Sequence, residues 1–247
     1  MNSTALDIPS NLIQALRDVH HVAVLTGSGI SAESGVPTFR EAQTGLWSRF
    51  KPEDLATPEA FKRNPKLVWE WYAWRGELVS GAQPNAGHVA LVEWQRRVPQ
   101  FTLITQNVDG LHQRAGSGNV IELHGNIGRT KCFEENRIVE KWPETGEAPP
   151  RCPRCGGHLR PDVVWFGETL PVEALERAVA AARSCDLFLS IGTSTVVHPA
   201  ASLPFEALEQ GATVVEINPD STPLTPHAHH VLRGPAGRVL PELVRHR

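Results

Sequence analysis

The chain places amide, carboxylate and imidazole side chains directly after two apolar segments that we expect to be buried strands. Gln106, Asn107 and Asp109 follow the first segment, and His124 follows the second. Polar groups on rigid, buried elements are costly unless they bind or react, because burial removes the water that solvates them. Histidine titrates near neutral pH and suits general-base work. The sequence therefore predicts a catalytic site with His124 as its base.

Three other apolar segments end in small polar residues that suit a phosphate or a ribose. Gly-Ser-Gly at 27–29 follows the first, Gly-Thr-Ser at 192–194 follows a later one, and Asn218 follows the third. Glycine lets the backbone approach a pyrophosphate closely, and N–H groups at a helix start can bind its charge. The spacing is not G-x-G-x-x-G, since the next glycine is Gly35, so an ordinary turn is the alternative at each position. Together the loops favour a nucleotide cofactor.

A parallel sheet would bring these segments together. Apolar runs alternate with amphipathic segments, which is typical of a doubly wound α/β fold. We expect strands over 21–26, 101–105, 120–123, 186–191 and 213–217, and helices over 9–19, 87–97 and 172–183. Ligands of such sheets bind at the carboxyl ends of the strands. The predicted fold is a Rossmann-like parallel sheet with the site at one edge.

Two stretches interrupt this alternation. Residues 53–80 are rich in Trp, Leu and charge at helical spacing, whereas strand signals vanish between 128 and 160 and three of the four cysteines occur there. We interpret both as insertions that form a smaller domain. The predicted division is a Rossmann-like domain of residues 1–45, 86–127 and 161–247, a helical insertion of residues 46–85, and a cysteine-bearing insertion of residues 128–160.

Composition limits the class of partner. The 247 residues carry a net charge of −3, with 40% hydrophobic and 21% charged residues, which are values of a globular protein with no basic surplus for nucleic acid. No run of eighteen apolar residues predicts a membrane span, and the first residues lack the pattern of a secretory signal. Four cysteines are too few for a disulfide framework. We therefore expect a cytoplasmic protein that acts away from membranes and nucleic acid.

Seven sequence motifs occur in order along nearly the whole chain. They are GSGISAESGVPTFR at 27–40, GLW at 45–47, TQNVDGLH at 105–112, LHG at 123–125, PDVVWFGE at 161–168, GTS at 192–194 and Asn218. This set resembles the sirtuins, and most closely the compact bacterial members. Sirtuins are NAD-dependent protein lysine deacylases. Two departures are small: Ser28 stands where alanine is usual, and Thr38 where many members have aspartate.

The resemblance implies a role for each matching position. His124 would act as general base on a ribose hydroxyl of NAD, and the products would be free lysine, nicotinamide and O-acyl-ADP-ribose. The implied cofactor-binding residues are Gly27, Ser28, Gly29, Ile30, Glu33, Phe39, Arg40, Trp47, Gln106, Asn107, Asp109, Gly192, Thr193, Ser194, Asn218 and Ala236. Of these, the last five would hold the adenosine half of NAD. The implied substrate channel comprises Val163, Val164, Trp165, Phe166 and Gly167. It would offer a strand edge to acylated lysine segments of other proteins.

Tyr72 and Arg75 bear on the acyl group. They are three residues apart, so on a helix they share a face. A phenol and a guanidinium that converge suit a carboxylate, because arginine can hold it with two hydrogen bonds. The other interpretation is an amphipathic helix with Tyr72 in the core and Arg75 in solvent. A Tyr-x-x-Arg pair also resembles the mark of sirtuins that prefer succinyl- and malonyl-lysine, so we predict an acidic acyl pocket.

Sirtuins commonly hold a structural zinc ion with two Cys-x-x-Cys pairs, but here one pair is incomplete. Cys152 and Cys155 form the second pair, whereas Cys132 is followed by Glu135 at the matching position. Three thiolates remain, and Glu135, His158 or a water molecule would complete a tetrahedron. A zinc-ribbon-like insertion that binds zinc and one that folds without metal both fit this pattern. The fourth cysteine, at 185, precedes an apolar run and is expected in the core.

Other interpretations use the same residues differently. A protein ADP-ribosyltransferase would share the NAD site, and a non-catalytic NAD-sensing protein would keep binding without turnover. A hydride-transfer dehydrogenase is disfavoured because the G-x-G-x-x-G loop is absent. The run His-Ala-His-His at 227–230 is expected to be a surface loop rather than a metal site. A monomer is favoured.

Overall fold

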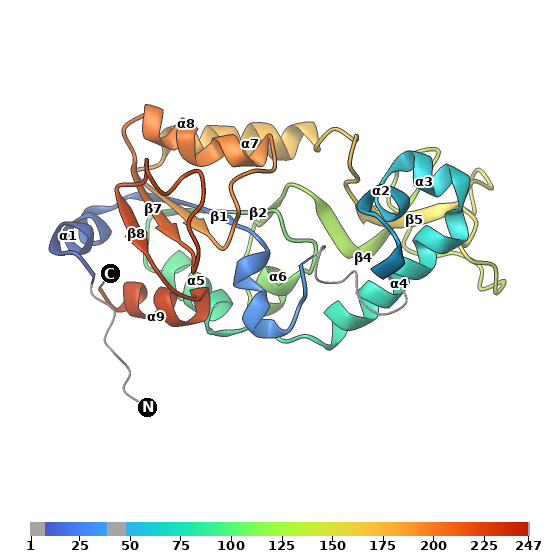
Figure 1. Ribbon diagram of the computed structural model, residues 1–247, viewed down its shortest axis with the longest axis horizontal. Coiled ribbons are helices and arrows are strands. Elements are labelled where there is room, and N and C mark those ends of the chain that lie inside the picture. Colours follow the sequence, from blue (N-terminus) through green and yellow to red (C-terminus); the bar gives the residue numbers. More distant parts are fainter. Residues whose placement is uncertain (1–7, 39–47, 247) are drawn as a thin grey trace.

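A six-stranded parallel sheet forms the centre of the protein. The computed structural model describes residues 8–38 and 48–246. The sheet order is β3-β2-β1-β6-β7-β8, with all neighbours parallel (Figure 1). Its strands are β1 (His21–Thr26), β2 (Gln100–Thr105), β3 (Ile121–Glu122), β6 (Leu187–Ile191), β7 (Thr213–Ile217) and β8 (His230–Leu232). The order reverses beside β1, so β1, β2 and β6 end at the topological switch point where such sheets bind ligands.

Helices cover both faces of the sheet and bury it completely at its centre. The residues of β1 are all buried and alternate between two cores: Val22 and Val24 pack in one, Ala23 and Leu25 in the other. The first core is closed by α1 (Ser10–Asp18), α5 (Ala86–Gln95) and α9 (Ala236–Arg245), and the second by α7 (Val172–Ser184) and α8 (Leu203–Glu209) (Figure 1). Burial on both faces explains why these strands are continuous apolar runs.

A smaller lobe lies at one end of the sheet (Figure 1). It contains three helices, α2 (Pro52–Leu55), α3 (Pro58–Arg63) and α4 (Pro65–Gly81), and an antiparallel pair, β4 (Gly125–Cys132) and β5 (Leu159–Val163). The side chains of Thr57 and Asn64 accept hydrogen bonds from the first turns of α3 and α4, so each helix begins at a capped residue. Aromatic residues from both parts share one core, in which the ring centroids of Phe61 and Trp165 lie 5.3 Å apart with the rings tilted at 43°.

The structure confirms the predicted parallel sheet and adds several elements that were not predicted. Strand β8 was not predicted, because three residues are too few for a periodic signal. The pair β4–β5 was not predicted either, and its sequences contain Gly125, Pro161 and several charged residues that do not read as strand. The helical insertion forms three helices, and the helices α6 (Leu111–Ala115), α8 and α9 were not predicted. The proposed domain boundaries stay a prediction. Among the residues that the structure describes, no helix combines the length and apolar character needed to cross a bilayer.

Candidate functional site

A cavity of about 400 Å³ lies where β1, β2 and β6 end, between the sheet and the smaller lobe. The predicted residues that line it are Gly27, Ser28, Tyr72, Arg75, Gln106, Asn107, Asp109, His124, Val163, Val164, Trp165, Phe166, Gly167, Thr193 and Ser194. Residues given no role from the sequence also line it, namely Ser31, Val36, Pro37, Thr38, Ala56, Val79, Val108, Glu168, Leu170, Val197 and His198. Several of these residues lie within the motifs quoted above, and that position was the one sequence feature that could have identified them as site residues.

The loops after β1 and β6 touch each other through glycines. Gly29 N–H donates to the Gly192 carbonyl at 2.8 Å, and a Cβ on Gly27 would lie 2.7 Å from the Gly192 oxygen. Side chains at these positions would push the loops apart, which is why glycine is needed there. Gly192 also has φ of +57°, a conformation that favours glycine. The first loop continues into a short 3-10 helix, η1 (Ser28–Ile30).

Asn107 and Asp109 are held by hydrogen bonds to the first glycine loop. The Asn107 amide donates to the Gly27 carbonyl at 3.0 Å and to the Ser31 hydroxyl at 3.1 Å. That hydroxyl donates to an Asp109 carboxylate oxygen at 2.7 Å, and the other oxygen accepts from Leu111 N–H at 2.9 Å. Both predicted residues are buried. Their polar atoms are therefore fixed in place before any ligand arrives.

A hydrogen bond to the backbone fixes which ring nitrogen of His124 carries the proton. Its Nδ1 lies 2.9 Å from the Gln106 carbonyl oxygen, which can only accept, so Nδ1 carries the proton and Nε2 the lone pair. Burial lowers the pKa of His124 below its ordinary value of 6.5, and the hydrogen bond to Gln106 opposes part of this shift. The imidazole is therefore neutral at pH 7 and able to take a proton.

Tyr72 and Arg75 both reach the cavity from α4. Neither is in solvent, since Tyr72 is 4% and Arg75 is 8% exposed. Burial raises the pKa of Tyr72 to about 12, with the Arg75 cation opposing the shift. Burial also lowers the pKa of Arg75, opposed by Tyr72 and Asp109. The interpretation that places Arg75 in solvent is wrong, because Arg75 is buried and lines the cavity together with Tyr72.

The segment 163–168 forms the opposite wall. Glu168 accepts from Arg160 at 2.5 and 3.0 Å and from Trp165 N–H at 2.7 Å. The Arg160 guanidinium lies 3.2 Å from the Trp165 ring centroid and donates to the Val163 carbonyl at 2.7 Å. A further bond runs from Val164 N–H to the His124 carbonyl at 2.9 Å. These contacts hold the wall rigidly beside the predicted base.

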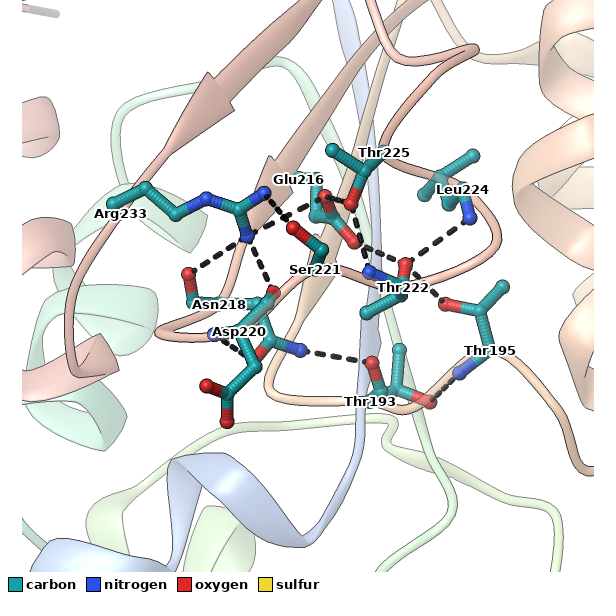
Figure 2. A network of polar contacts seen from close by, with 10 residues as sticks. All are labelled: Thr193, Thr195, Glu216, Asn218, Asp220, Ser221, Thr222, Leu224, Thr225 and Arg233. Carbon is teal, nitrogen blue, oxygen red and sulfur yellow. Dashed lines mark hydrogen bonds and ion pairs between the residues drawn. The ribbon is translucent and has the colours of Figure 1, made fainter.

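The other predicted cofactor residues lie outside the cavity lining. Asn218 donates to the Thr193 carbonyl at 2.9 Å, so it joins the loops after β6 and β7 (Figure 2). Ile30 is completely buried in the core, and Ala236 begins α9 with 4% exposure. Glu33 accepts a hydrogen bond from Gly237 N–H. Their predicted roles stay predictions, and the predicted Phe39, Arg40 and Trp47 lie outside the described residues.

Three cysteines and one glutamate come together in the smaller lobe. Ligand atoms of Cys132, Glu135, Cys152 and Cys155 all lie within 4.8 Å of one another, a group that could hold a metal ion. Cys132 and Cys155 sulfurs are 3.4 Å apart. His158 is not in this group. Three thiolates and a carboxylate fit the ligand chemistry and the number of ligands of a tetrahedral zinc site.

The remaining histidine and cysteine predictions are also placed. Cys185 is 7% exposed and packs in the second sheet core, as expected. Within the described residues, the 227–230 run forms no metal-binding group. His227 and His229 are exposed between elements, as predicted for a surface loop, whereas His230 begins β8.

The sheet and the cavity at its switch point define a Rossmann-like α/β protein with a small second lobe. Residues 27–199 match the model of the Sir2 family. The chain is 60% identical to the NAD-dependent protein deacylase of Aquifex aeolicus over 206 residues, covering 83% of this chain and 86% of that protein. The chain therefore belongs to the Sir2 family, and its resemblance to the sirtuins is confirmed.

Solved structures agree with this assignment. A Sir2 homologue in complex with NAD superposes with a TM-score of 0.90 at 48% identity, covering 99% of this chain and 96% of that chain. A Sir2 structure with a p53 peptide and NAD⁺ gives a TM-score of 0.83 at 29% identity, covering 96% of this chain and 97% of that chain.

Proposed function

We propose that this protein removes acyl groups from lysine side chains of other proteins and consumes NAD in doing so. The carrying observation is the cavity itself, which is lined by His124, by Asn107 and Asp109, and by residues of both glycine loops. The names of the relatives, NAD-dependent protein deacylases, and the NAD-bound structure support the proposal. The products would be nicotinamide, O-acyl-ADP-ribose and free lysine.

We propose the following roles for residues that line the cavity. Bound NAD supplies the ribose carbon and hydroxyls that receive the acyl group. His124 accepts a proton at Nε2 from a ribose hydroxyl, because Nδ1 is already committed to the Gln106 carbonyl. Asn107 and Asp109 bind and orient the nicotinamide-ribose half. Trp165, 2% exposed, lines the cavity and excludes water from the reacting atoms.

We propose further that the acyl pocket accepts succinyl and malonyl groups as well as acetyl. Tyr72 and Arg75 support this, since both line the cavity and both are buried. A buried guanidinium is better compensated when an anionic group enters beside it, and it can hold a carboxylate with two hydrogen bonds. An acetyl group offers no such partner.

The protein substrate would bind mainly through its backbone. Val163–Gly167 line the cavity, and Phe166, 55% exposed, stands at the surface. A wall of this kind suits strand addition by an extended peptide. A structural relative in complex with a p53 peptide and NAD⁺ supports a peptide substrate. The cytoplasmic location and the monomeric state stay predictions.

We propose zinc as a structural ion at the cysteine group. Cys132, Cys152, Cys155 and Glu135 would hold it and cross-link the two halves of the insertion. Glu135 already pairs with Arg154 at 3.0 Å, so the carboxylate is partly oriented. The site supplies no chemistry to the cavity.

One experiment tests the activity directly. Nicotinamide release is followed with NAD and one peptide carrying either acetyl- or succinyl-lysine. We expect turnover by the native protein, loss of nearly all turnover with retained NAD binding in His124→Ala, and no change in the surface control His227→Ala. Silence on both peptides, or full activity of His124→Ala, would overturn the proposal. Adenine label retained on protein would indicate ADP-ribosyl transfer instead.

A further inference from the structure

A buried carboxylate stands behind the loops predicted to bind the adenosine half of NAD. Glu216 of β7 is 1% exposed. Its carboxylate accepts hydrogen bonds from the hydroxyls of Thr222 and Thr225, the latter at 2.6 Å, and Arg233 Nη1 lies 3.9 Å away (Figure 2). A buried charge is costly without such partners, so the three groups and the carboxylate hold each other in place. No motif in the sequence pointed to Glu216.

Thr222 connects Glu216 by hydrogen bonds to the loop after β6. Its hydroxyl donates to Glu216, and a hydroxyl has only one proton, so its lone pairs are left to accept. They accept from Leu224 N–H at 3.1 Å and from the Thr195 hydroxyl at 3.4 Å (Figure 2). The charge on Glu216 therefore fixes which way the Thr222 hydroxyl points, and with it the partner of Thr195.

Thr195 needs such a partner because its backbone is strained. Its φ is +55°, a left-handed conformation that is an outlier for a β-branched residue. Strain of this kind persists only where the surroundings hold it. Thr195 directly follows the loop Gly192–Ser194, and its N–H points to the Thr193 hydroxyl at 3.4 Å. The shape of that loop therefore depends on Thr195 staying in place.

Arg233 carries the same constraint to the turn after β7. Its guanidinium donates to the carbonyl oxygens of Asn218 and Asp220 and to the Ser221 hydroxyl at 3.0 Å (Figure 2). Asn218 in turn donates to the Thr193 carbonyl. One carboxylate is thus connected to both loops at which the adenosine half is predicted to bind.

We propose that Glu216 is a positioning residue for the adenosine half of NAD. Through Thr222 and Thr195 it holds the loop after β6, and through Arg233 it holds the turn after β7. The inference rests on the proposed function, because it assumes that NAD binds at these loops. Glu216 lines neither the cavity nor its wall at residues 163–168. Its substitution should therefore change the affinity for NAD and leave the binding of the acyl peptide unaffected.

The test measures NAD binding directly, by calorimetry on the whole protein without acyl peptide. We expect Glu216→Gln to raise the Kd for NAD about tenfold, the loss that follows when a hydrogen bond to a charged group is weakened. The KM for the acyl peptide should change less than twofold. The matched control is Glu206→Gln, a glutamate paired with Arg183 at 2.8 Å on α8, which should bind NAD like the native protein.

Two isosteric variants separate positioning from stability and serve also if Glu216→Gln does not fold. Thr222→Val removes the link to Thr195 and should match Glu216→Gln. Thr225→Val removes the other hydroxyl on Glu216 and also the acceptor of the Thr222 N–H at 2.8 Å, but it leaves the Thr222 hydroxyl and its link to Thr195, so it should raise the Kd for NAD less than Thr222→Val does. Equal effects of the two, an unchanged Kd in Glu216→Gln, or a parallel rise in peptide KM would overturn the inference.

A double variant tests the role of strain. Glycine at 195 adopts the same backbone without cost, so the loop would no longer depend on Glu216. We expect Glu216→Gln to raise the Kd no more than about threefold in a Thr195→Gly background, and a full tenfold rise there would refute the inference. Native protein that binds no NAD would overturn the proposed function as well, whereas native binding with unaffected variants overturns this inference alone.

Discussion

Replacing Arg75 by methionine should separate acidic from neutral acyl groups. The side chain is 8% exposed and lines the cavity together with Tyr72. Methionine keeps much of the length and apolar stem but removes the charge and all hydrogen-bond donors. We therefore expect activity on succinyl-lysine to fall sharply, while activity on acetyl-lysine, which brings no charge to this position, falls at most about threefold.

The size of the effect follows from the burial of the cation. A hydrogen bond to a charged group contributes about 1.5–3 kcal/mol. At about 4 Å and an effective dielectric constant of about 20, the full attraction of two charges reaches about 4 kcal/mol, which sets the upper limit. Since about 1.4 kcal/mol is tenfold, kcat/KM for the succinyl peptide should fall about 10- to 100-fold. Stability should not suffer electrostatically, because burial already lowers the pKa of Arg75 and disfavours its charge.

The assay is nicotinamide release at low peptide concentration, with the same peptide carrying either acyl group. Arg160→Met is the matched control, since Arg160 is also a buried arginine, 3% exposed, but pairs with Glu168. Its loss should lower both activities by the same factor. If Arg75→Met also lowers both activities equally, the carboxylate interpretation is refuted and Tyr72 and Arg75 serve packing alone.

Gly27→Ala should weaken NAD binding and lower the free energy of unfolding in urea by about 1–3 kcal/mol, because its Cβ would meet the facing loop at 2.7 Å. The control Gly76→Ala in α4 has open space around it, so it should keep native NAD binding and a native or slightly higher free energy of unfolding. The Arg160 guanidinium holds the pKa of Glu168 below its ordinary value, although burial opposes this shift. The pair therefore stabilises the fold above about pH 4.5, and this contribution is lost as the pH falls further. Glu168→Gln should make the free energy of unfolding depend less on pH in that acidic range, and an unchanged slope would contradict this. Metal analysis should find about one zinc per chain, and Cys152→Ser should abolish it and lower the melting temperature; full occupancy in that variant would exclude the cysteine group as the site.

Much of the sheet was readable from local pattern. The segments 21–26 and 213–217 are mostly apolar because both sheet faces are covered, and that burial leaves a recognisable signal. The polar residues after them were readable for a related reason, since an amide or imidazole after a buried strand stands out against its surroundings. The segment β4 carried no such signal, because it is charged and irregular and gains its partner only from β5.

The cluster of site residues could be anticipated, but the contacts that hold it could not. Arg160 and Glu168 are eight residues apart and look like ordinary surface charges, yet they form an ion pair in which Arg160 is buried against the Trp165 ring. Glu216 lies in an apolar strand, and nothing near it in the chain shows that Arg233 faces it. Such pairs depend on which loops the fold brings together.

The order of residues along this chain thus specified the family, the parallel sheet, the base at 124 and the acyl-selective pair at 72 and 75 as candidates. Those features are local, since each is a short run or a fixed spacing. Contacts between distant segments determine the orientation of His124 and the burial of Arg75. They also form the hydrogen-bond network that joins Glu216 to the loops after β6 and β7. Burial and hydrogen-bond geometry exist only once those segments are packed, so they appear with the folded structure.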